Sequence, residues 1–215
     1  DSKWRDYILG LKKQIESGAP AVLYSVKQFE YATDLSFINK DQMILPPNDD
    51  IIAGWDEVSS RIYDCLIRYI KKDMLQGKLK LFISHAKRDG LATAENFRNS
   101  IRSKTKLDSF FDKNDIIEGV DFENQIRDNV ESSLLMVLDS DAYGIRQWCQ
   151  KEILCAKKYN VPIIVVNMHS DVITRTFPYM GNVPSIRLKD DNLDTAINLL
   201  LRTGLRYEYQ KIYLK

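Results

Sequence analysis

Apolar and polar positions alternate between two kinds of segment over the last two thirds of the chain. Short, continuous apolar runs are typical of parallel strands that are buried on both faces of a sheet. These runs fall at residues 79–84, 107–112, 134–140, 161–167 and 183–188. Segments with apolar residues at helical spacing follow four of the five runs, at residues 91–104, 122–133, 145–159 and 192–204. The pattern predicts a flavodoxin-like α/β fold, with a five-stranded parallel sheet and helices on both faces.

The helical segments also predict which face of a helix is buried and where a helix ends. Within residues 91–104, one apolar face is formed by Leu91, Ala94, Phe97 and Ile101. The last predicted helix is expected to end at Gly204, because glycine is common just past a helix C-terminus.

The first 77 residues are less regular. Residues 4–17 read as a helix ended by Gly18, residues 21–26 as a strand, and Pro46-Pro47 as a break in regular structure. Residues 55–76 read as a long amphipathic helix. Its expected apolar face consists of Val58, Ile62, Leu66, Tyr69 and Ile70. We predict an α-rich N-terminal module or half-domain at residues 1–77, of unknown role, followed by the main domain at residues 78–215. Because the chain begins at Asp1 rather than at methionine, we expect it to be part of a longer protein.

Composition narrows the class of protein. The 215 residues carry a net charge of +1, so the overall charge does not point to a nucleic acid or a membrane surface as a partner. No apolar run approaches the ~20 residues of a membrane-spanning helix. Three cysteines are too few for a disulfide framework, which favours a reducing compartment such as the cytoplasm. With only two histidines, no zinc-like spacing is found and no metal site is expected.

The first buried run ends abruptly in small and polar residues, Ser84, His85 and Ala86. In doubly wound sheets, ligands bind beyond the carboxyl ends of the strands, where the strand order reverses. We therefore expect these residues to border a ligand site, with small side chains leaving room for the ligand. His85 could donate a hydrogen bond to a phosphate or a sugar, or it could be a loop histidine satisfied within the protein.

Glu152 is the strongest candidate for chemistry. It lies four residues after Trp148 in a predicted helix, so the two side chains share a face one turn apart. In a cleft, the carboxylate could act electrostatically or in acid–base chemistry while the indole stacks on a flat ligand. The alternative is a surface glutamate paired with a lysine, and a tryptophan that helps to bury the helix.

The segment after the second predicted strand offers further candidates. Asp112 ends that strand, although aspartate is also common there as a turn former or helix cap. Residues 113–121 contain Gly119 and are expected to form a loop. Ile116 and Ile117 are unusually apolar for an exposed turn, which favours contact with another molecule. Neither a Walker-type loop nor a G-x-G-x-x-G pattern is present.

Four segments, in this order, resemble the conserved boxes of Toll/interleukin-1 receptor (TIR) domains. They read FISHAKRDG (82–90), SFFDKNDIIEGVDFENQI (109–126), LLMVLDSDAYGIRQWCQKEI (134–153) and VPIIVV (161–166). The first is similar to the bacterial form of its box. The third is similar to the stretch in which TIR enzymes carry a tryptophan and, four residues on, a catalytic glutamate. The resemblance covers about residues 79–205.

The resemblance implies a flavodoxin-like fold and, where the glutamate is kept, cleavage of NAD+ at the nicotinamide–ribose bond. Glu152 maps onto the catalytic glutamate, Trp148 onto its stacking partner, and Asp112 onto an acidic residue beside the loop. The edge of the substrate pocket at the first strand maps onto Phe82, Ser84 and His85. NAD+ is then the substrate, and no cofactor is needed.

A single carboxylate is chemically sufficient for this reaction. Glycosidases need a general acid because the leaving oxygen must be protonated, whereas nicotinamide leaves NAD+ as a neutral molecule. The carboxylate can stabilise an oxocarbenium-like sugar or orient its hydroxyl groups. Capture by water gives linear ADP-ribose and capture by an adenine nitrogen gives a cyclic product, and the sequence leaves both open.

The resemblance also implies activation by TIR–TIR association through the loop after the second strand, here with Ile116, Ile117 and Gly119. A bacterial anti-phage or other immune pathway is the expected setting. Further domains or partner proteins are expected, without direct binding to nucleic acid or membranes. Two other functions remain open: a non-catalytic TIR adaptor or scaffold, and a nucleoside-processing transferase of similar fold.

Overall fold

The computed structural model of the chain describes residues 2–18, 25–26, 43–44, 54–74, 80–105, 108–110, 133–169, 178–189 and 193–213. It divides into two compact units, Asp1–Val58 and Ser59–Lys215. The division falls within helix α2 (Trp55–Met74), so most of this helix belongs to the second unit. The domain boundary expected after residue 77 stays a prediction. The two units reflect how the residues pack, which does not show where one domain ends and the next begins.

The first unit contains α1 (Ser2–Glu16) and a two-stranded parallel sheet of β1 (Ser25–Val26) and β2 (Met43–Ile44). The predicted helix at residues 4–17 is confirmed. Gly18 follows it with a φ of 98°, in the left-handed region that glycine adopts without steric cost. Its backbone N–H donates to the carbonyl of Ile15, which satisfies one group of the last helical turn.

The second unit is built on a five-stranded sheet in the order β4-β3-β5-β6-β7, and every neighbouring pair is parallel. The strands are β3 (Lys80–His85), β4 (Asp108–Phe110), β5 (Ser133–Asp139), β6 (Ile163–Asn167) and β7 (Ser185–Arg187). From β3 the chain passes to β4 at one edge and then returns to β5 on the other side of β3. The strand order therefore reverses between β3 and β5, as in flavodoxin-like sheets, and the predicted fold class is confirmed.

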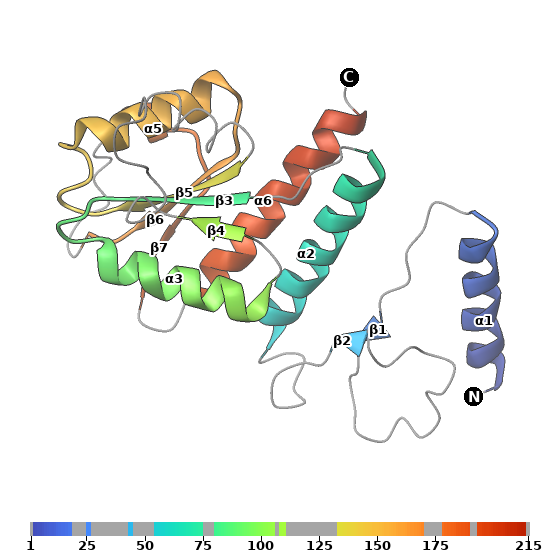
Figure 1. The fold of residues 1–215 in the computed structure, drawn as a ribbon. Helices are drawn as coiled ribbons and strands as arrows, with labels where there is room; N and C mark the ends of the chain where they lie inside the picture. The colour runs from blue at the N-terminus through green and yellow to red at the C-terminus, as the bar shows by residue number, and fades with distance from the viewer. Residues whose placement is uncertain are drawn as a thin grey trace. The chain divides into compact units, whose positions relative to one another are not determined.

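Helices cover both faces of this sheet (Figure 1). On one face lie α3 (Leu91–Lys104) and α6 (Leu193–Tyr213), and on the other lies α5 (Gln147–Lys158). Alternate residues of β5 point to opposite faces: Leu134 and Met136 pack with α3 and α6, while Leu135 and Val137 pack with α5. This burial on two faces explains why the strands read as continuous apolar runs. The helix predicted at residues 122–133 lies outside the described residues, apart from Ser133, which begins β5.

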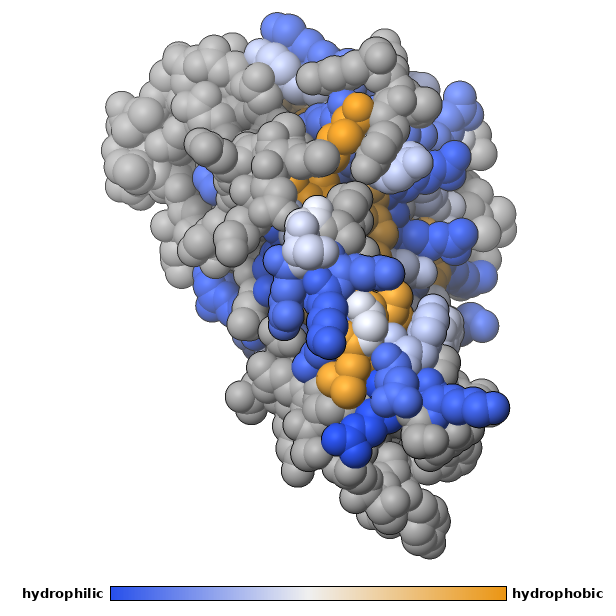
Figure 2. All heavy atoms as spheres, turned by 90° about the vertical axis from the view of Figure 1, so that its right-hand side faces the viewer, coloured by the Kyte–Doolittle hydropathy of each residue, from blue (hydrophilic) through white to orange (hydrophobic). Residues whose placement is uncertain are grey.

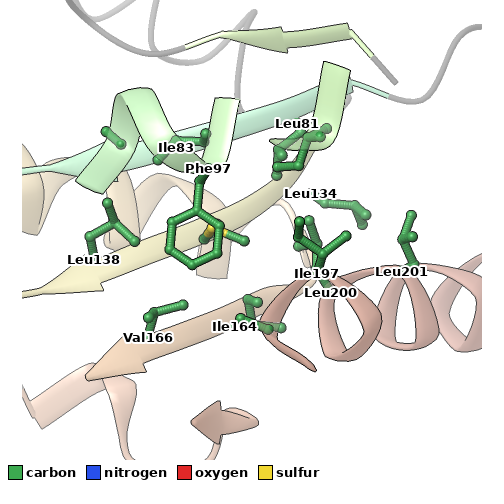
Figure 3. Packing of buried hydrophobic residues seen from close by; sticks show 14 of the residues in the cluster. Leu81, Ile83, Phe97, Leu134, Leu138, Ile164, Val166, Ile197, Leu200 and Leu201 are labelled. Atoms are coloured by element: carbon green, nitrogen blue, oxygen red, sulfur yellow. The ribbon is translucent and has the colours of Figure 1, made fainter. Parts of the chain in front are cut away.

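The larger core cluster lies on the face of the sheet that α3 and α6 cover. Figure 3 shows how strand and helix side chains interdigitate in it. Its labelled members from the strands are Leu81, Ile83, Leu134, Leu138, Ile164 and Val166, and those from the helices are Phe97, Ile197, Leu200 and Leu201. The predicted inner face of α3 is confirmed, because Ala94, Phe97 and Ile101 are buried and Leu91 packs against them.

Gly204 does not end the last helix, so this prediction is wrong. α6 continues to Tyr213, with Gly204 in its interior. A Cβ atom at Gly204 would lie 2.6 Å from Cδ1 of Leu134 on β5. The close approach of a helix to a strand, rather than a helix end, therefore favours glycine at this position.

Helix α2 packs into the second unit beside α6 (Figure 1). Ile67 is fully buried in the larger core cluster, and the side-chain amide of Asn198 donates to the hydroxyl of Ser59. The apolar face expected for this helix is partly wrong, because Tyr69 is exposed and Ile67 takes the central place. Three further buried positions are polar, Ser59, Ser60 and Asp64, so apolar periodicity alone could not locate the buried face.

On the face shown in Figure 2, hydrophilic residues predominate among the described ones, and hydrophobic residues appear only in narrow strips between them. Among the described helices, none has the length and apolar character required to cross a bilayer.

Candidate functional site

The candidate site lies at the carboxyl end of β3, where the strand order reverses. Ser84 and His85 end this strand and pair in register with Val137 and Leu138 of β5. Both side chains are buried. The chain leaves β5 through residues 140–146 and then enters α5, which packs on the face of the sheet that carries Phe82. This connection brings a helix back over the end of β3.

Glu152 of α5 reaches the end of β3. Its side chain is buried, at 4% exposure, and its Oε2 atom accepts a hydrogen bond from the Oγ atom of Ser84. A carboxylate removed from water requires such a partner, because an unpaired buried charge is strongly unfavourable. The structure therefore brings together two of the residues singled out from the sequence.

Tyr143 completes a chain of three buried side chains. Its hydroxyl lies 2.5 Å from the Oγ atom of Ser84, and the residue is 0% exposed. Burial, and after it the negative charge of Glu152, raises the pKa of the Tyr143 hydroxyl well above its usual value. The phenol therefore keeps its proton in the folded protein at neutral pH. The sequence interpretation did not identify Tyr143. Its only signal was its place in the segment between the third strand and the helix that carries Glu152.

Asp89 fixes the segment that carries Tyr143. This aspartate follows β3, and its carboxylate accepts one hydrogen bond from the Ser140 hydroxyl at 2.6 Å and another from the Ala142 N–H at 3.0 Å. The loop after β3 and the loop after β5 are thereby joined at two points. Asp89 was not identified from the sequence, because aspartate is common in any loop.

His169, which follows β6, holds the segment after β5 at a second point. The Nδ1 atom of His169 lies 2.6 Å from Oδ1 of Asp141, and its Nε2 atom lies 3.5 Å from Oδ1 of Asp139. The backbone N–H of His169 donates to the side chain of Asn167. Within the part of the chain that the structure describes, no group of three His, Cys, Asp or Glu side chains is arranged to hold a metal ion.

Trp148 lies on the outer side of α5. Its side chain is 49% exposed, and the Nζ atom of Lys151 lies 4.5 Å from the centre of a ring of the indole. This is the geometry of a cation–π contact. The sequence predicts that these two side chains, one turn apart, share a face of the helix, but they differ in burial: the indole is half exposed and the Glu152 carboxylate is buried.

Phe82 and His85 are both buried, the first in the middle of β3 and the second at its end. Phe82 packs in the cluster beneath α5, and the Nδ1 atom of His85 lies 3.4 Å from the carbonyl oxygen of Ile83. The binding roles predicted for both residues stay predictions. The remaining residues singled out from the sequence, Asp112, Ile116, Ile117 and Gly119, lie outside the described residues.

Comparison with known proteins identifies one matching family model. Residues 81–201 match the model described as TIR domain. No curated protein matches the chain.

Several solved structures are similar to part of the chain. A metazoan TIR-STING receptor from C. gigas, solved in complex with 2',3'-cGAMP, has 22% sequence identity and a TM-score of 0.48, over 62% of this chain and 45% of that chain. The TIR domains of the activated Roq1 resistosome have 14% identity and a TM-score of 0.40, over 63% of this chain and 100% of that chain. The sugar isomerase domain of the RpiR transcription factor from Sphaerobacter thermophilus has 10% identity and a TM-score of 0.38, over 75% of this chain and 96% of that chain. The chain spans less than half of the TIR-STING receptor.

Proposed function

The chain belongs to the TIR domain family, and from this premise we propose that it cleaves NAD+ at the nicotinamide–ribose bond, with Glu152 as the catalytic carboxylate. The observation that carries the proposal is the position of Glu152, buried against Ser84 at the carboxyl end of β3. Ligands of doubly wound sheets bind at this place, where the strand order reverses.

A purely structural role explains this carboxylate poorly. Taking an ionised side chain out of water is unfavourable by several kcal/mol in a protein, so a buried carboxylate adds little to stability. Buried, charged residues at a ligand-binding edge are therefore candidates for function. Glu152 combines burial, a hydrogen bond and this location.

The chemistry needs one negative charge near the ribose. When the bond from C1' of the ribose to the nicotinamide nitrogen breaks, its electron pair goes to the nicotinamide, which leaves as a neutral base. The positive charge passes to the ribose as an oxocarbenium ion, which the Glu152 carboxylate stabilises by charge. Addition of water to C1' gives ADP-ribose and releases one proton, whereas attack by an adenine nitrogen gives cyclic ADP-ribose.

Substrate contacts follow from the same arrangement. The indole of Trp148 is accessible, so we assign it the stacking of a flat ring of the dinucleotide. The resemblance to TIR enzymes assigns Ser84, His85 and Phe82 to the ribose end of the substrate, and Asp112 to a role beside the loop predicted at residues 113–121. Association through residues Ile116, Ile117 and Gly119 activates the enzyme, in a bacterial immune pathway.

The test is release of nicotinamide from NAD+ at high protein concentration, by the wild type and by Glu152→Gln. We expect the variant to lose at least about 100-fold in rate, a loss typical of removing a group that stabilises transition-state charge. Asp194→Asn is the matched control, because it also converts a carboxylate to an amide but lies on α6, where it pairs with Lys104. Equal rates for the wild type and a folded Glu152→Gln variant would reject the proposal.

A non-catalytic TIR adaptor is the second candidate. Ile145, Trp148 and Leu154 are exposed apolar residues of α5 and of the loop before it, and such side chains suit a contact with another protein. An adaptor would release no nicotinamide at any concentration. A nucleoside-processing transferase would act on deoxynucleosides instead of NAD+, so the same assay with both substrates distinguishes the three functions.

A further inference from the structure

We infer that Tyr143 is a positioning residue, whose hydroxyl acts through Ser84 to hold the carboxylate of Glu152 in its place at the end of β3. The inference extends the proposed function, since it rests on Glu152 being the catalytic group.

The direction of the hydrogen bonds follows from counting protons. Ser84 has one hydroxyl proton, and it is donated to the carboxylate of Glu152, which can only accept. The oxygen of Ser84 must therefore accept the second bond, so the hydroxyl of Tyr143, 2.5 Å away, is its donor. The other acceptor near Tyr143 is the carbonyl oxygen of Cys149 at 3.5 Å, a much longer contact. The series of hydrogen bonds therefore runs from Tyr143 through Ser84 to Glu152.

Burial strengthens this series of hydrogen bonds. Tyr143 and Ser84 are 0% and 1% exposed, so water cannot readily replace either bond. Successive hydrogen bonds polarise one another in a medium of low dielectric constant, and each strengthens the next. The raised pKa of Tyr143 keeps the phenol protonated, and therefore keeps it a donor, throughout the neutral range.

The backbone of Tyr143 is held independently of its hydroxyl. Its N–H donates to the carbonyl of Ser140, and its own carbonyl accepts from the N–H of Arg146. Asp89 holds the same loop at Ser140 and Ala142. A change of tyrosine to phenylalanine therefore removes one hydrogen bond and leaves the loop in place.

The consequence is a loss of orientation rather than of binding. Without the Tyr143 hydroxyl, Ser84 is no longer held with its proton directed at Glu152, and the carboxylate samples more positions. Small misplacements of a catalytic group reduce the rate steeply, so we expect Tyr143→Phe to lower kcat about tenfold. The KM for NAD+ should change less than kcat, because Trp148, which we assign to stacking of the dinucleotide, is untouched and only the orientation of Ser84 and Glu152 is disturbed.

The experiment is a double-mutant cycle on nicotinamide release. It compares the wild type, Tyr143→Phe, Ser84→Ala and the double variant, each checked for folding by circular dichroism. Because Tyr143 acts through Ser84, Tyr143→Phe should lower kcat in the wild type but have little further effect in Ser84→Ala. In Ser84→Thr, which keeps the hydroxyl, the effect of Tyr143→Phe should return. An unchanged kcat in Tyr143→Phe, or the same loss with and without the Ser84 hydroxyl, would overturn the inference.

A second measurement does not depend on activity. With tyrosine labelled by ¹³C at Cζ, the NMR signal of Tyr143 is identified by its absence in Tyr143→Phe. Glu152→Gln should shift this signal in the wild-type background and shift it by less than half as much in Ser84→Ala. Equal shifts in both backgrounds would contradict the coupling of Tyr143 to Glu152 through Ser84. If the wild type releases no nicotinamide, the proposed function fails, while this measurement still decides whether Tyr143 is coupled to Glu152 through Ser84.

Discussion

Ser84 donates a hydrogen bond to Glu152, a residue 68 positions later in the chain. Ser84 is the last residue but one of β3, next to which the strand order reverses, and Glu152 lies in α5, the helix that follows the neighbouring strand β5. The two residues meet because β3 and β5 are adjacent in the sheet and α5 packs on the face that these two strands share.

Tyr143 should give the stability of the protein a specific dependence on alkaline pH. Its pKa is raised in the folded protein, mainly by burial, so above the unfolded value near 10 the unfolded chain loses a proton that the folded chain keeps. Its contribution to stability is therefore constant below about pH 10 and falls above it, by at most about 1.4 kcal/mol per pH unit. Urea denaturation of the wild type and Tyr143→Phe across this range measures the difference.

The stability difference between the wild type and Tyr143→Phe should shrink above about pH 10. A difference that stays level across this range would show that burial does not hold the proton on Tyr143.

Ile67 should contribute strongly to the stability of the second unit. It is fully buried in the larger core cluster, so Ile67→Ala should lower the free energy of unfolding by about 2–5 kcal/mol. Tyr69→Ala, two residues on in the same helix, removes an exposed side chain and should change it by less than about 0.5 kcal/mol. Urea denaturation measures both. Equal, small effects would mean that α2 is not part of this core.

Gly204→Ala tests the close approach between α6 and β5. Alanine favours helix by about 1 kcal/mol over glycine, but here its Cβ would lie 2.6 Å from Leu134, so we expect a net destabilisation of about 1–3 kcal/mol. Gly10→Ala in α1 is the matched control, because no atom lies within 4 Å of its Cβ position, and it should not destabilise. Adding Leu134→Ala should reduce the effect of Gly204→Ala. A stabilising Gly204→Ala would contradict this account.

The loop after β4 is predicted to carry the activating association. Ile116→Asp combined with Ile117→Asp places two charges where apolar contact is expected, and should abolish nicotinamide release without unfolding the protein. Light scattering should show loss of association at the concentration at which the wild type is active. Tyr209→Asp, which changes an exposed residue of α6, is the control and should remain active. Full activity of the double variant would reject the role of the loop.

Much of the fold was predictable because its cause is local. A strand buried on both faces needs apolar residues throughout, and the continuous runs of β3, β5 and β6 meet this need. The inner face of α3 repeats at helical spacing for the same reason. Alternation of such runs with helices leaves few topologies, so the parallel sheet followed from the pattern.

The buried face of α2 and the place of Gly204 were not predictable in this way. Ser60 and Asp64 are buried although they are polar, so the hydrophobic pattern of α2 predicts its buried face only in part. Gly204 looked like a helix end because sequence shows only that glycine is unusual there. A glycine suits this position because the side chain of Leu134, distant along the chain, lies next to it in space.

For the candidate site, the sequence by itself determined the strand end with Ser84 and His85, the helix with Trp148 and Glu152, and the resemblance to TIR domains. Only the tertiary structure decided that Glu152 points inward while Trp148 faces outward, and that Tyr143 joins Ser84. The physical reason is that periodicity and motifs report a residue's neighbours along its own helix or strand. Hydrogen bonds between buried groups depend on which elements the fold brings into contact.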